Sequence, residues 1–328
     1  MLLSRRSFLF GASAAAALGA DHRAEAQSTW PARPIRFVVP LPPGGSYDYL
    51  ARALAEPVSK SLNQPIVVEN RVGADGRLGV EFLARQPADG YSIGIISSTN
   101  TAHTALFKEM PFDIINDFAP IGIICNGPFA LIVSPSMPVN DVRGFMDLVK
   151  SRPGYVTFAS SGNGSPWHLI GEMLKSRANV DMVHVAYKGT TQIRQALLGG
   201  EVMCAFAPIG PFMAMINEGN VRALAVCSDS PSELLPSLKP LSVELGIPNL
   251  ALTPWLGVVT LKGTPNEIVN KLSREFAQVV NTPEFAREKL LHQGYEPVGS
   301  TPERMAQTMR DDIIMFAQIV RDAHIVAE

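Results

Sequence analysis

Short runs of β-branched residues alternate with helical patterns along most of the chain. The strands predicted from these runs are Ile35–Val39, Ile66–Glu69, Ser92–Ser97, Phe129–Val133, Val156–Ser160, Met182–Ala186, Val202–Phe206, Arg222–Val226 and Trp255–Val259. The helical patterns follow them, as in the four-residue spacing of Leu50, Leu54, Val58 and Leu62. Alternation of this kind predicts an α/β fold whose parallel sheets are covered by helices on both faces.

The remaining predicted helices continue this order and end in a run of three. They are Val80–Leu83, Thr101–Phe107, Val142–Lys150, the segment after Ser165, Thr191–Leu198, Pro265–Val280, Thr282–Leu291 and Thr301–Ala323. A chain of 328 residues with 46% hydrophobic content should form about two domains. No low-complexity linker separates the two α/β series, so we expect strands to cross the boundary between them.

The net charge of -2 and the scattered Lys and Arg residues exclude a basic field for a polyanion, and nucleic acid is not an expected partner. Cys125, Cys204 and Cys227 lie in apolar runs without the close spacing of a metal site. Buried thiols are favoured there, with one disulfide as the alternative. We expect neither a metal nor a cofactor.

The N-terminus has the pattern of an export signal. Arg5 and Arg6 precede an apolar run over 8–20, and the small-residue pattern Ala24-Glu25-Ala26 follows. This predicts a signal peptide of the twin-arginine type over residues 1–26, cleaved near Ala26. The run is short for a membrane anchor that stays attached, which is the alternative.

Two turns rich in Gly and Ser join a predicted strand to a helix. One lies in "LPPGGSYDYLARALAEPVSKSL", and the other in "VTFASSGNGSPWHLIGEMLKS", where Ser165 is an N-cap candidate and Pro166 stands at the first helical position. Free N–H groups and the helix dipole make such places favourable for an anion, and glycines let a ligand approach the backbone. Two such turns facing each other across a cleft would hold a carboxylate from both sides.

At these residues the chain resembles the substrate-binding proteins of tripartite tricarboxylate transporters, the Bug family. The resemblance covers nearly the whole length after the signal and rests on motifs in the family's order. They are "PPGGSYDYLAR", "QPIVVENRVGADGRLG", "ADGYSI", "PFDIINDFAPIG", "ASSGNGSPWHLIGE", "VHVAYKG", "LLGGEV", "VRALAV" and "GTPNEIVNKL". It implies a two-lobed periplasmic binding protein fold of the second type, with lobe 1 over 27–126 and 228–328 and lobe 2 over 127–227.

The resemblance also implies the function and the site. It implies a periplasmic receptor, expected as a monomer, that carries a small organic carboxylate to the membrane permease subunits of the transporter. The residues carried over are Gly44, Gly45, Ser46, Tyr47, Asp48, Ser160, Ser161, Gly162, Asn163, Gly164 and Ser165. We expect Asp48 to cap its helix rather than to contact the ligand, and we expect Gly45 and Gly162 to have positive φ.

The sequence departs from the family pattern at Leu41, Trp167, Ala207 and the following Pro208, which make the cleft less polar. These residues favour an aromatic or largely apolar monocarboxylate over citrate, because each buried charge needs partners. The alternative for Trp167 is that it packs within its own lobe.

A different class of protein competes with the receptor. Ser165 and His168 would serve an exported hydrolase or isomerase, although "GNGSP" is not the G-x-S-x-G elbow. His103 and His184 are interpreted as structural, and "RVGADGRLG" as a turn packed near the cleft. Phe112, Phe118 and Phe206 are expected in the core.

Overall fold

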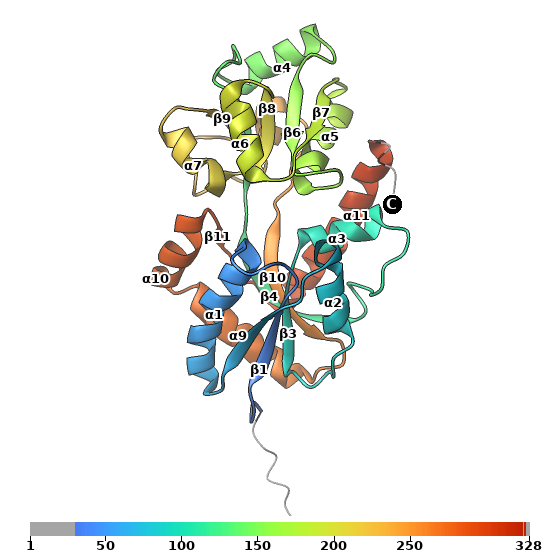
Figure 1. Ribbon diagram of the computed structural model, residues 1–328, viewed down its shortest axis with the longest axis vertical. Coiled ribbons are helices and arrows are strands. Elements are labelled where there is room, and N and C mark those ends of the chain that lie inside the picture. Colours follow the sequence, from blue (N-terminus) through green and yellow to red (C-terminus); the bar gives the residue numbers. More distant parts are fainter. Residues whose placement is uncertain (1–29, 324, 326–328) are drawn as a thin grey trace, which may run out of the picture.

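The computed structural model describes residues 30–323 and 325, and it divides them into two lobes, each built on its own sheet (Figure 1). The predicted signal peptide over residues 1–26 lies outside the described residues, and so does its cleavage near Ala26. The two-lobed α/β architecture predicted from the sequence is confirmed.

Lobe 1 holds a six-stranded sheet in the order β11-β4-β10-β3-β1-β2. Its strands are β1 (Ile35–Val39), β2 (Ile66–Asn70), β3 (Ser92–Ser97), β4 (Phe118–Asn126), β10 (Trp255–Leu261) and β11 (Glu296–Pro297). Its helices are α1 (Ser46–Leu62), η1 (Ala74–Gly76), α2 (Arg77–Ala84), α3 (Ser98–Leu106), α9 (Asn266–Val280), α10 (Pro283–Phe285), η2 (Ala286–Leu290), η3 (Leu291–Gln293) and α11 (Pro302–Asp322).

Lobe 2 holds a five-stranded sheet in the order β7-β6-β8-β5-β9. Its strands are β5 (Phe129–Val133), β6 (Thr157–Ser160), β7 (Val183–Ala186), β8 (Cys204–Pro208) and β9 (Arg222–Val226). Its helices are α4 (Val142–Ser151), α5 (Pro166–Ala178), α6 (Thr190–Gly199), α7 (Ile209–Asn217) and α8 (Leu241–Leu245).

Both sheets are mixed, so the expectation of parallel sheets is wrong. Strands β1, β2 and β3 are parallel to one another, as are β6, β7 and β8. Strand β10 is antiparallel to β3 and β4, and β5 is antiparallel to β8 and β9. The antiparallel strands include β4, after which the chain leaves lobe 1, and β10, by which it returns. Because the chain leaves and returns at the same end of the lobe, these two strands run in opposite directions.

The return crossing lies later than the predicted boundary between residues 227 and 228. After β9 the chain folds back over lobe 2, where Leu241, Leu250 and Leu252 pack in the core, and only then enters β10. Helix α11 adds a third link between the lobes. Met305 packs in a core cluster of lobe 1, whereas Phe316 at the other end of the helix packs in the core of lobe 2.

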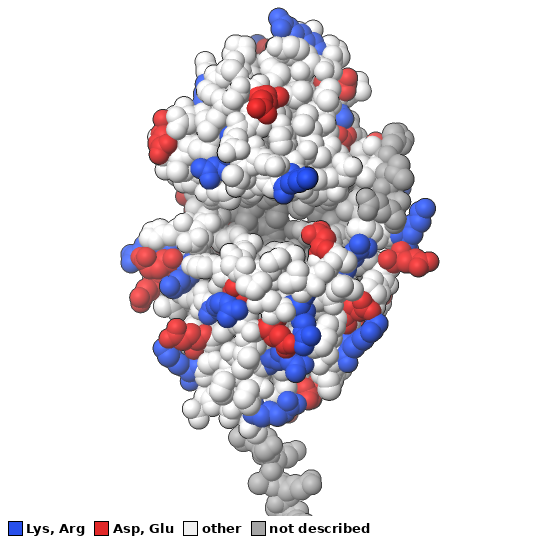
Figure 2. All heavy atoms as spheres, in the orientation of Figure 1, with Lys and Arg blue, Asp and Glu red and all other residues white. Residues whose placement is uncertain are grey.

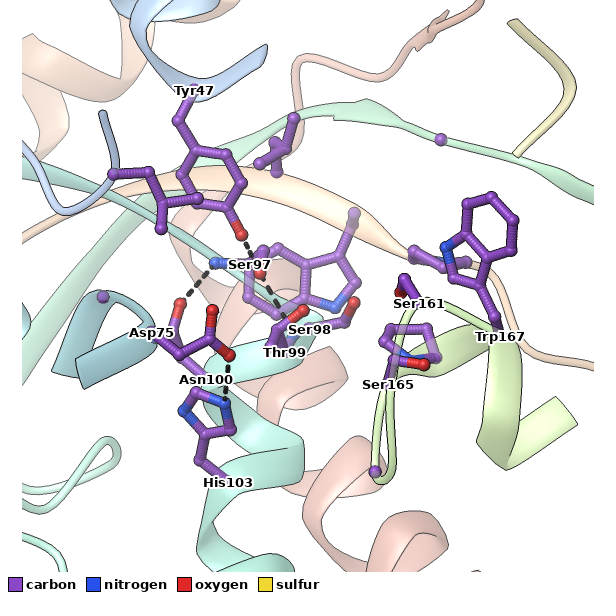
Figure 3. Close-up of a pocket in the computed structure, with 18 of the residues that line it drawn as sticks. Tyr47, Asp75, Ser97, Ser98, Thr99, Asn100, His103, Ser161, Ser165 and Trp167 are labelled. Atoms are coloured by element: carbon purple, nitrogen blue, oxygen red, sulfur yellow. Dashed lines mark hydrogen bonds and ion pairs between the residues drawn. The ribbon is translucent and has the colours of Figure 1, made fainter. Parts of the chain in front are cut away.

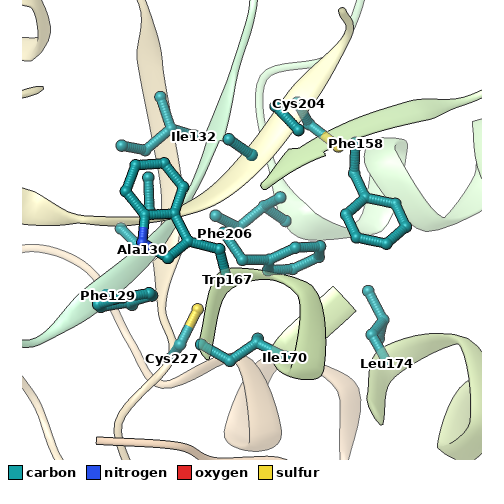
Figure 4. Close-up of a cluster of buried hydrophobic side chains, with 14 of the residues drawn as sticks. Phe129, Ala130, Ile132, Phe158, Trp167, Ile170, Leu174, Cys204, Phe206 and Cys227 are labelled. Carbon is teal, nitrogen blue, oxygen red and sulfur yellow. The ribbon is translucent and has the colours of Figure 1, made fainter. Parts of the chain in front are cut away.

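The core of lobe 2 gathers side chains from β5, β6, β8 and α5 (Figure 4). Phe206 is fully buried within it, and Phe112 and Phe118 are buried in lobe 1, as predicted. The three cysteines are free, buried thiols, and burial raises their pKa values. No helix in the described part of the chain combines the length and the apolar character needed to cross a bilayer.

Candidate functional site

A cavity of about 440 Å³ opens between the lobes, where Figure 2 shows the molecule hollowed at its waist. Its wall includes the N-termini of three helices, α1 and α3 from lobe 1 and α5 from lobe 2. Each of the three follows a strand: α3 begins at the residue after β3, whereas a short turn precedes α1 and α5. The N-terminal N–H groups and the dipoles of these helices therefore all favour negative charge in one cavity.

We call the turn before α1, residues 41–47, loop 1. Gly44 has φ of 81°, a left-handed conformation that glycine adopts without steric cost. Gly45 is the N-cap of α1, and its φ of -77° is accessible to any residue, so the expectation of positive φ there is wrong. Asp48 is buried, with its side chain 6% exposed, and it accepts a hydrogen bond from Gly44 N at 2.9 Å. Asp48 therefore holds loop 1 in shape, as expected.

A guanidinium completes the support of loop 1. Arg52 Nε lies 3.0 Å from each carboxylate oxygen of Asp48, one helical turn away. This pairing is the main reason that the pKa of Asp48 is lowered, with the Gly44 N–H as a smaller cause. The carboxylate is thus ionised at neutral pH, and it forms an ion pair with Arg52 behind loop 1.

Tyr47 joins loop 1 to the start of α3. Its hydroxyl donates to Ser97 Oγ, and Ser97 in turn caps α3 by accepting from Thr99 N at 3.0 Å (Figure 3). Burial raises the pKa of Tyr47 to about 12, so the hydroxyl stays protonated. The helix cap is closed from the other direction by Asn100 Oδ1, which accepts from Ser97 N at 2.9 Å.

We call the turn before α5, residues 160–167, loop 2. Ser165 is the N-cap and accepts from His168 N, and Pro166 occupies the first helical position, as predicted. Gly162 and Gly164 have φ of 129° and 73°, so loop 2 needs glycine at both positions. The positive φ expected for Gly162 is confirmed.

Two histidines support loop 2 from within lobe 2. His168 Nδ1 accepts a hydrogen bond from Gly164 N at 3.0 Å, and the rings of His168 and His184 stack with centroids 4.0 Å apart. His184 also hydrogen-bonds the buried hydroxyl of Ser160. Burial lowers the pKa of each imidazole to about 4, so both are neutral at pH 7.

Backbone donors remain for a ligand in both loops. Within the described residues, no hydrogen-bond partner is found for the N–H groups of Asn163 and Trp167 in loop 2 or of Ser46 and Tyr47 in loop 1. All four residues line the cavity. One small anion placed there would satisfy donors from two lobes.

The structure separates the predicted site residues into two groups. Those that line the cavity are Ser46, Tyr47, Ser161, Asn163, Gly164, Ser165, Trp167 and Pro208. The others are not part of the lining: Gly44, Gly45 and Gly162 lie in the loops and are exposed or half-buried, and Asp48, Ser160 and Ala207 are buried. Leu41, where the sequence departs from its family, is also in the wall.

Trp167 has both of the roles weighed for it. It lines the cavity, yet it is only 6% exposed and packs edge-on against Phe129 and Phe212, with ring centroids 5.9 and 6.1 Å away. Its largest contact is therefore with the core of lobe 2. Ala207 is fully buried in β8, so it does not form the wall that the sequence suggested.

A third part of the site, at the start of α3 and in η1, was not predicted from the sequence. Ser97, Ser98, Thr99 and Asn100 line the cavity, and so do Asp75 and His103 (Figure 3). A usable signal was present, because Ser97 follows the apolar pair Ile95 and Ile96 and stands where an N-cap is favoured. The turn around Asp75 was correctly placed near the cleft, and His103 proves to lie in its wall.

The Ser165 and His168 side chains are not arranged as nucleophile and base. Ser165 Oγ donates to Gly162 O at 2.7 Å, while the His168 imidazole faces Gly164 N. Ser160 and His184 do touch, but Ser160 is fully buried. Within residues 30–323 and 325, no group of three or more His, Cys, Asp or Glu side chains could hold a metal ion.

Comparison with known proteins agrees with this geometry. Residues 50–325 match the family model described as "Tripartite tricarboxylate transporter family receptor". Protein BugT from Bordetella pertussis is 34% identical over 96% of this chain and 94% of its own length.

Solved structures of the same kind superpose over most of the chain. Rpa4515 of R. palustris, solved with adipate, is 30% identical with a TM-score of 0.76, covering 90% of this chain and 99% of its own. MatC from Rhodopseudomonas palustris, solved with bound malate, is 28% identical with a TM-score of 0.71, covering 88% and 99%. The family and these neighbours are binding proteins, not enzymes, and this chain belongs to the receptor family of the tripartite tricarboxylate transporters.

Proposed function

We propose that this protein is a periplasmic receptor that captures a small carboxylate between its lobes and delivers it to the permease subunits of a tripartite tricarboxylate-type transporter. The observation that carries the proposal is the meeting of three helix N-termini, from both lobes, on one cavity. The adipate and malate held by two structural neighbours are carboxylates, which supports the same class of ligand.

Each helix N-terminus stabilises a nearby anion by about 0.3–2 kcal/mol. Donors from two lobes can therefore bias the lobes toward a closed arrangement around the ligand without holding them closed in its absence. Among the described residues that line the cavity there is no Lys or Arg. The carboxylate would be held by backbone N–H groups and hydroxyls, so the protein should bind it reversibly, as a transport receptor must.

The wall also supports an aromatic or largely apolar ligand body. Apolar side chains from both lobes line the cavity, namely Leu41, Leu106, Phe107, Phe129, Trp255 and Leu256. A citrate-like ligand would bring two further charges to this wall, where they would lack partners. We therefore favour a monocarboxylate.

A screen of organic acids tests the proposal. The purified protein is incubated with aromatic and aliphatic monocarboxylates, dicarboxylates and citrate, and thermal unfolding and product formation are both measured. We expect a rise in the unfolding temperature with at least one monocarboxylate and no product. Turnover of any acid would favour the hydrolase or isomerase, and tighter binding of citrate than of every monocarboxylate would overturn the proposed ligand class.

Localisation is part of the same proposal and has its own test. Export through a twin-arginine-type signal predicts that the mature protein begins just after Ala26 and lies in the periplasmic fraction. N-terminal sequencing of the fractionated protein would show this. Retention of Arg5 and Arg6 in the mature chain would contradict it.

A further inference from the structure

One charged side chain stands in the cavity wall. Asp75 is the one Asp, Glu, Lys or Arg among the described residues that line the cavity. Its side chain is 75% exposed, and the ion pair found for it is with His103 Nε2 at 3.5 Å. Figure 3 shows the Asp75 carboxylate between the start of α3 and His103. A carboxylate placed this way can accept further hydrogen bonds.

No guanidinium neutralises this carboxylate. Arg77 is the neighbouring cation, but its guanidinium lies 3.7 Å from the centre of the Phe107 ring, and its Nε donates to Ala74 O. Hydrogen bonding to His103 is the main reason that the pKa of Asp75 is lowered. Asp75 is therefore ionised at neutral pH, and it gives its side of the cavity a negative charge.

Unpartnered polar groups mark the same wall. Ser98 and His103 both line the cavity and are 2% and 3% exposed. Within the described residues, neither Ser98 Oγ nor His103 Nδ1 has a hydrogen-bond partner. Buried polar atoms nearly always have one, and these two atoms are themselves buried behind the surface of the wall. His103 Nε2 pairs with Asp75, so Nδ1 is the unpartnered atom of the ring.

The cavity thus favours a negative ligand charge at one place and a positive one at another. The N–H groups of Asn163 and Trp167 in loop 2 favour an anion, whereas the Asp75 carboxylate favours a donor with positive charge. A second carboxylate near Asp75 would be repelled by its negative charge. A protonated amine there would gain a charge-assisted hydrogen bond.

We propose that the ligand is a zwitterionic monocarboxylate, of the amino-acid type, whose carboxylate lies at the helix N-termini and whose protonated nitrogen faces Asp75. The inference rests on the proposed function and narrows its ligand class. Asp75 is then the residue that selects amino acids over carboxylates of the same size that lack nitrogen.

Matched pairs of acids test the inference by calorimetry. Each pair differs only by an amino group: phenylalanine with 3-phenylpropanoate, 5-aminopentanoate with pentanoate, and glutamate with glutarate. In the wild type we expect the amino member of the best-bound pair to bind at least about tenfold more tightly. In Asp75→Asn this ratio should fall to about threefold or less, while binding of the acid without nitrogen is retained or improved. Asp229→Asn, an exposed position outside the cavity, is the matched control and should keep the wild-type ratio.

Each outcome bears on one claim. If acids without nitrogen bind the wild type as tightly as their amino partners, or if Asp75→Asn leaves the ratio unchanged, the inference is overturned and the carboxylate receptor stands. If no carboxylate of either series binds the folded wild type, the proposed function fails as well. Circular dichroism of Asp75→Asn confirms that the variant is folded.

Discussion

Loop 1 and loop 2 have the same plan but different internal support. Each leads from a parallel strand into a helix, with glycine in a left-handed conformation and an aromatic residue at the second helical position, Tyr47 or Trp167. Loop 1 is braced by an ionised carboxylate, because Asp48 bonds Gly44 N and Arg52. Loop 2 is braced by neutral groups, the Ser165 hydroxyl and the His168 imidazole.

The difference shows how two loops of similar backbone structure can favour different parts of one ligand. On lobe 1 the carboxylate of Asp48 is paired with Arg52, whereas the carboxylate of Asp75 has no guanidinium partner and offsets part of the positive field of the helix N-termini. Behind the start of α5 the two imidazoles are neutral at pH 7, and the carboxylate of Glu172 is paired with Lys175. Loop 2 should therefore supply most of the binding energy for the ligand carboxylate.

The two aromatic residues should differ most in their effect on stability. Trp167→Ala leaves a cavity beside Phe129 and Phe212 in the core of lobe 2, and we expect a loss of about 3–5 kcal/mol in the free energy of unfolding. Tyr47→Phe removes one hydrogen bond to Ser97, and we expect about 1 kcal/mol. Chemical denaturation measures both. Equal losses would mean that Trp167 is not a core residue.

Substitution of a glycine should lower the ligand affinity much more in loop 2 than in loop 1. Gly162→Val forces a β-branched residue to φ of 129°, although the space around it is open, so we expect a folded protein whose affinity falls at least about a hundredfold. Gly45→Val, at φ of -77°, should cost less than about tenfold. Calorimetry with the best-bound acid measures both affinities. A larger loss at Gly45 would reverse the assigned roles of the two loops.

Acid should weaken loop 2 before loop 1. The pKa values of His168 and His184 fall from an ordinary 6.5 to about 4 on folding, so their contribution to stability is full above pH 6.5 and is lost as the pH falls toward 4. The pKa of Asp48 is lowered from 3.8, so its contribution persists until the pH falls below that value. Denaturation at pH 7, 6 and 5 should show falling stability.

Two variants serve as matched controls for this pH dependence. His184→Gln should flatten the slope between pH 7 and 5, and Asp48→Asn should lower stability without changing that slope. An unchanged slope in His184→Gln would show that the imidazole pair does not cause the pH dependence of stability.

The smallest expected effect concerns the helix caps. Ser165→Ala removes the hydroxyl that accepts from His168 N, and we expect a loss of about 1 kcal/mol in stability and less than tenfold in affinity. Ser46→Ala is the matched control for stability, because the N-cap of α1 is Gly45 and makes no side-chain cap bond, so little change in the free energy of unfolding is expected. Loss of all binding in Ser165→Ala would indicate direct ligand contact instead.

Much of the fold could be predicted because strands such as Ile35–Val39 and Phe129–Val133 are continuous apolar runs between turn residues. Strand β4 was missed for a physical reason. It contains Pro120 and Gly122, which normally mark turns, and both lie beside shifts in its register with β10. The mixed sheets and the late return crossing depend on long-range pairing, which local patterns do not encode.

The candidate site was predicted where local backbone chemistry defines it, as in the cap at Ser165. Asp75 and His103 were not recognised as site residues, because 28 positions separate them in the chain and only the packing of η1 against α3 brings them together. The same limit applies to Ala207, which follows an apolar run and was assigned to the wall, although strand pairing turns it into the core.

Amide chemical shifts test most directly whether both loops hold one carboxylate. Uniformly ¹⁵N-labelled protein is titrated with the best-bound acid of the screen, and the amides of Ser46 and Tyr47 in loop 1 and of Asn163 and Trp167 in loop 2 are followed. We predict that all four shift along one binding curve with a single Kd, with the larger shifts in loop 2. Saturable shifts confined to one loop, or to neither, would contradict a receptor that grips its ligand from both lobes.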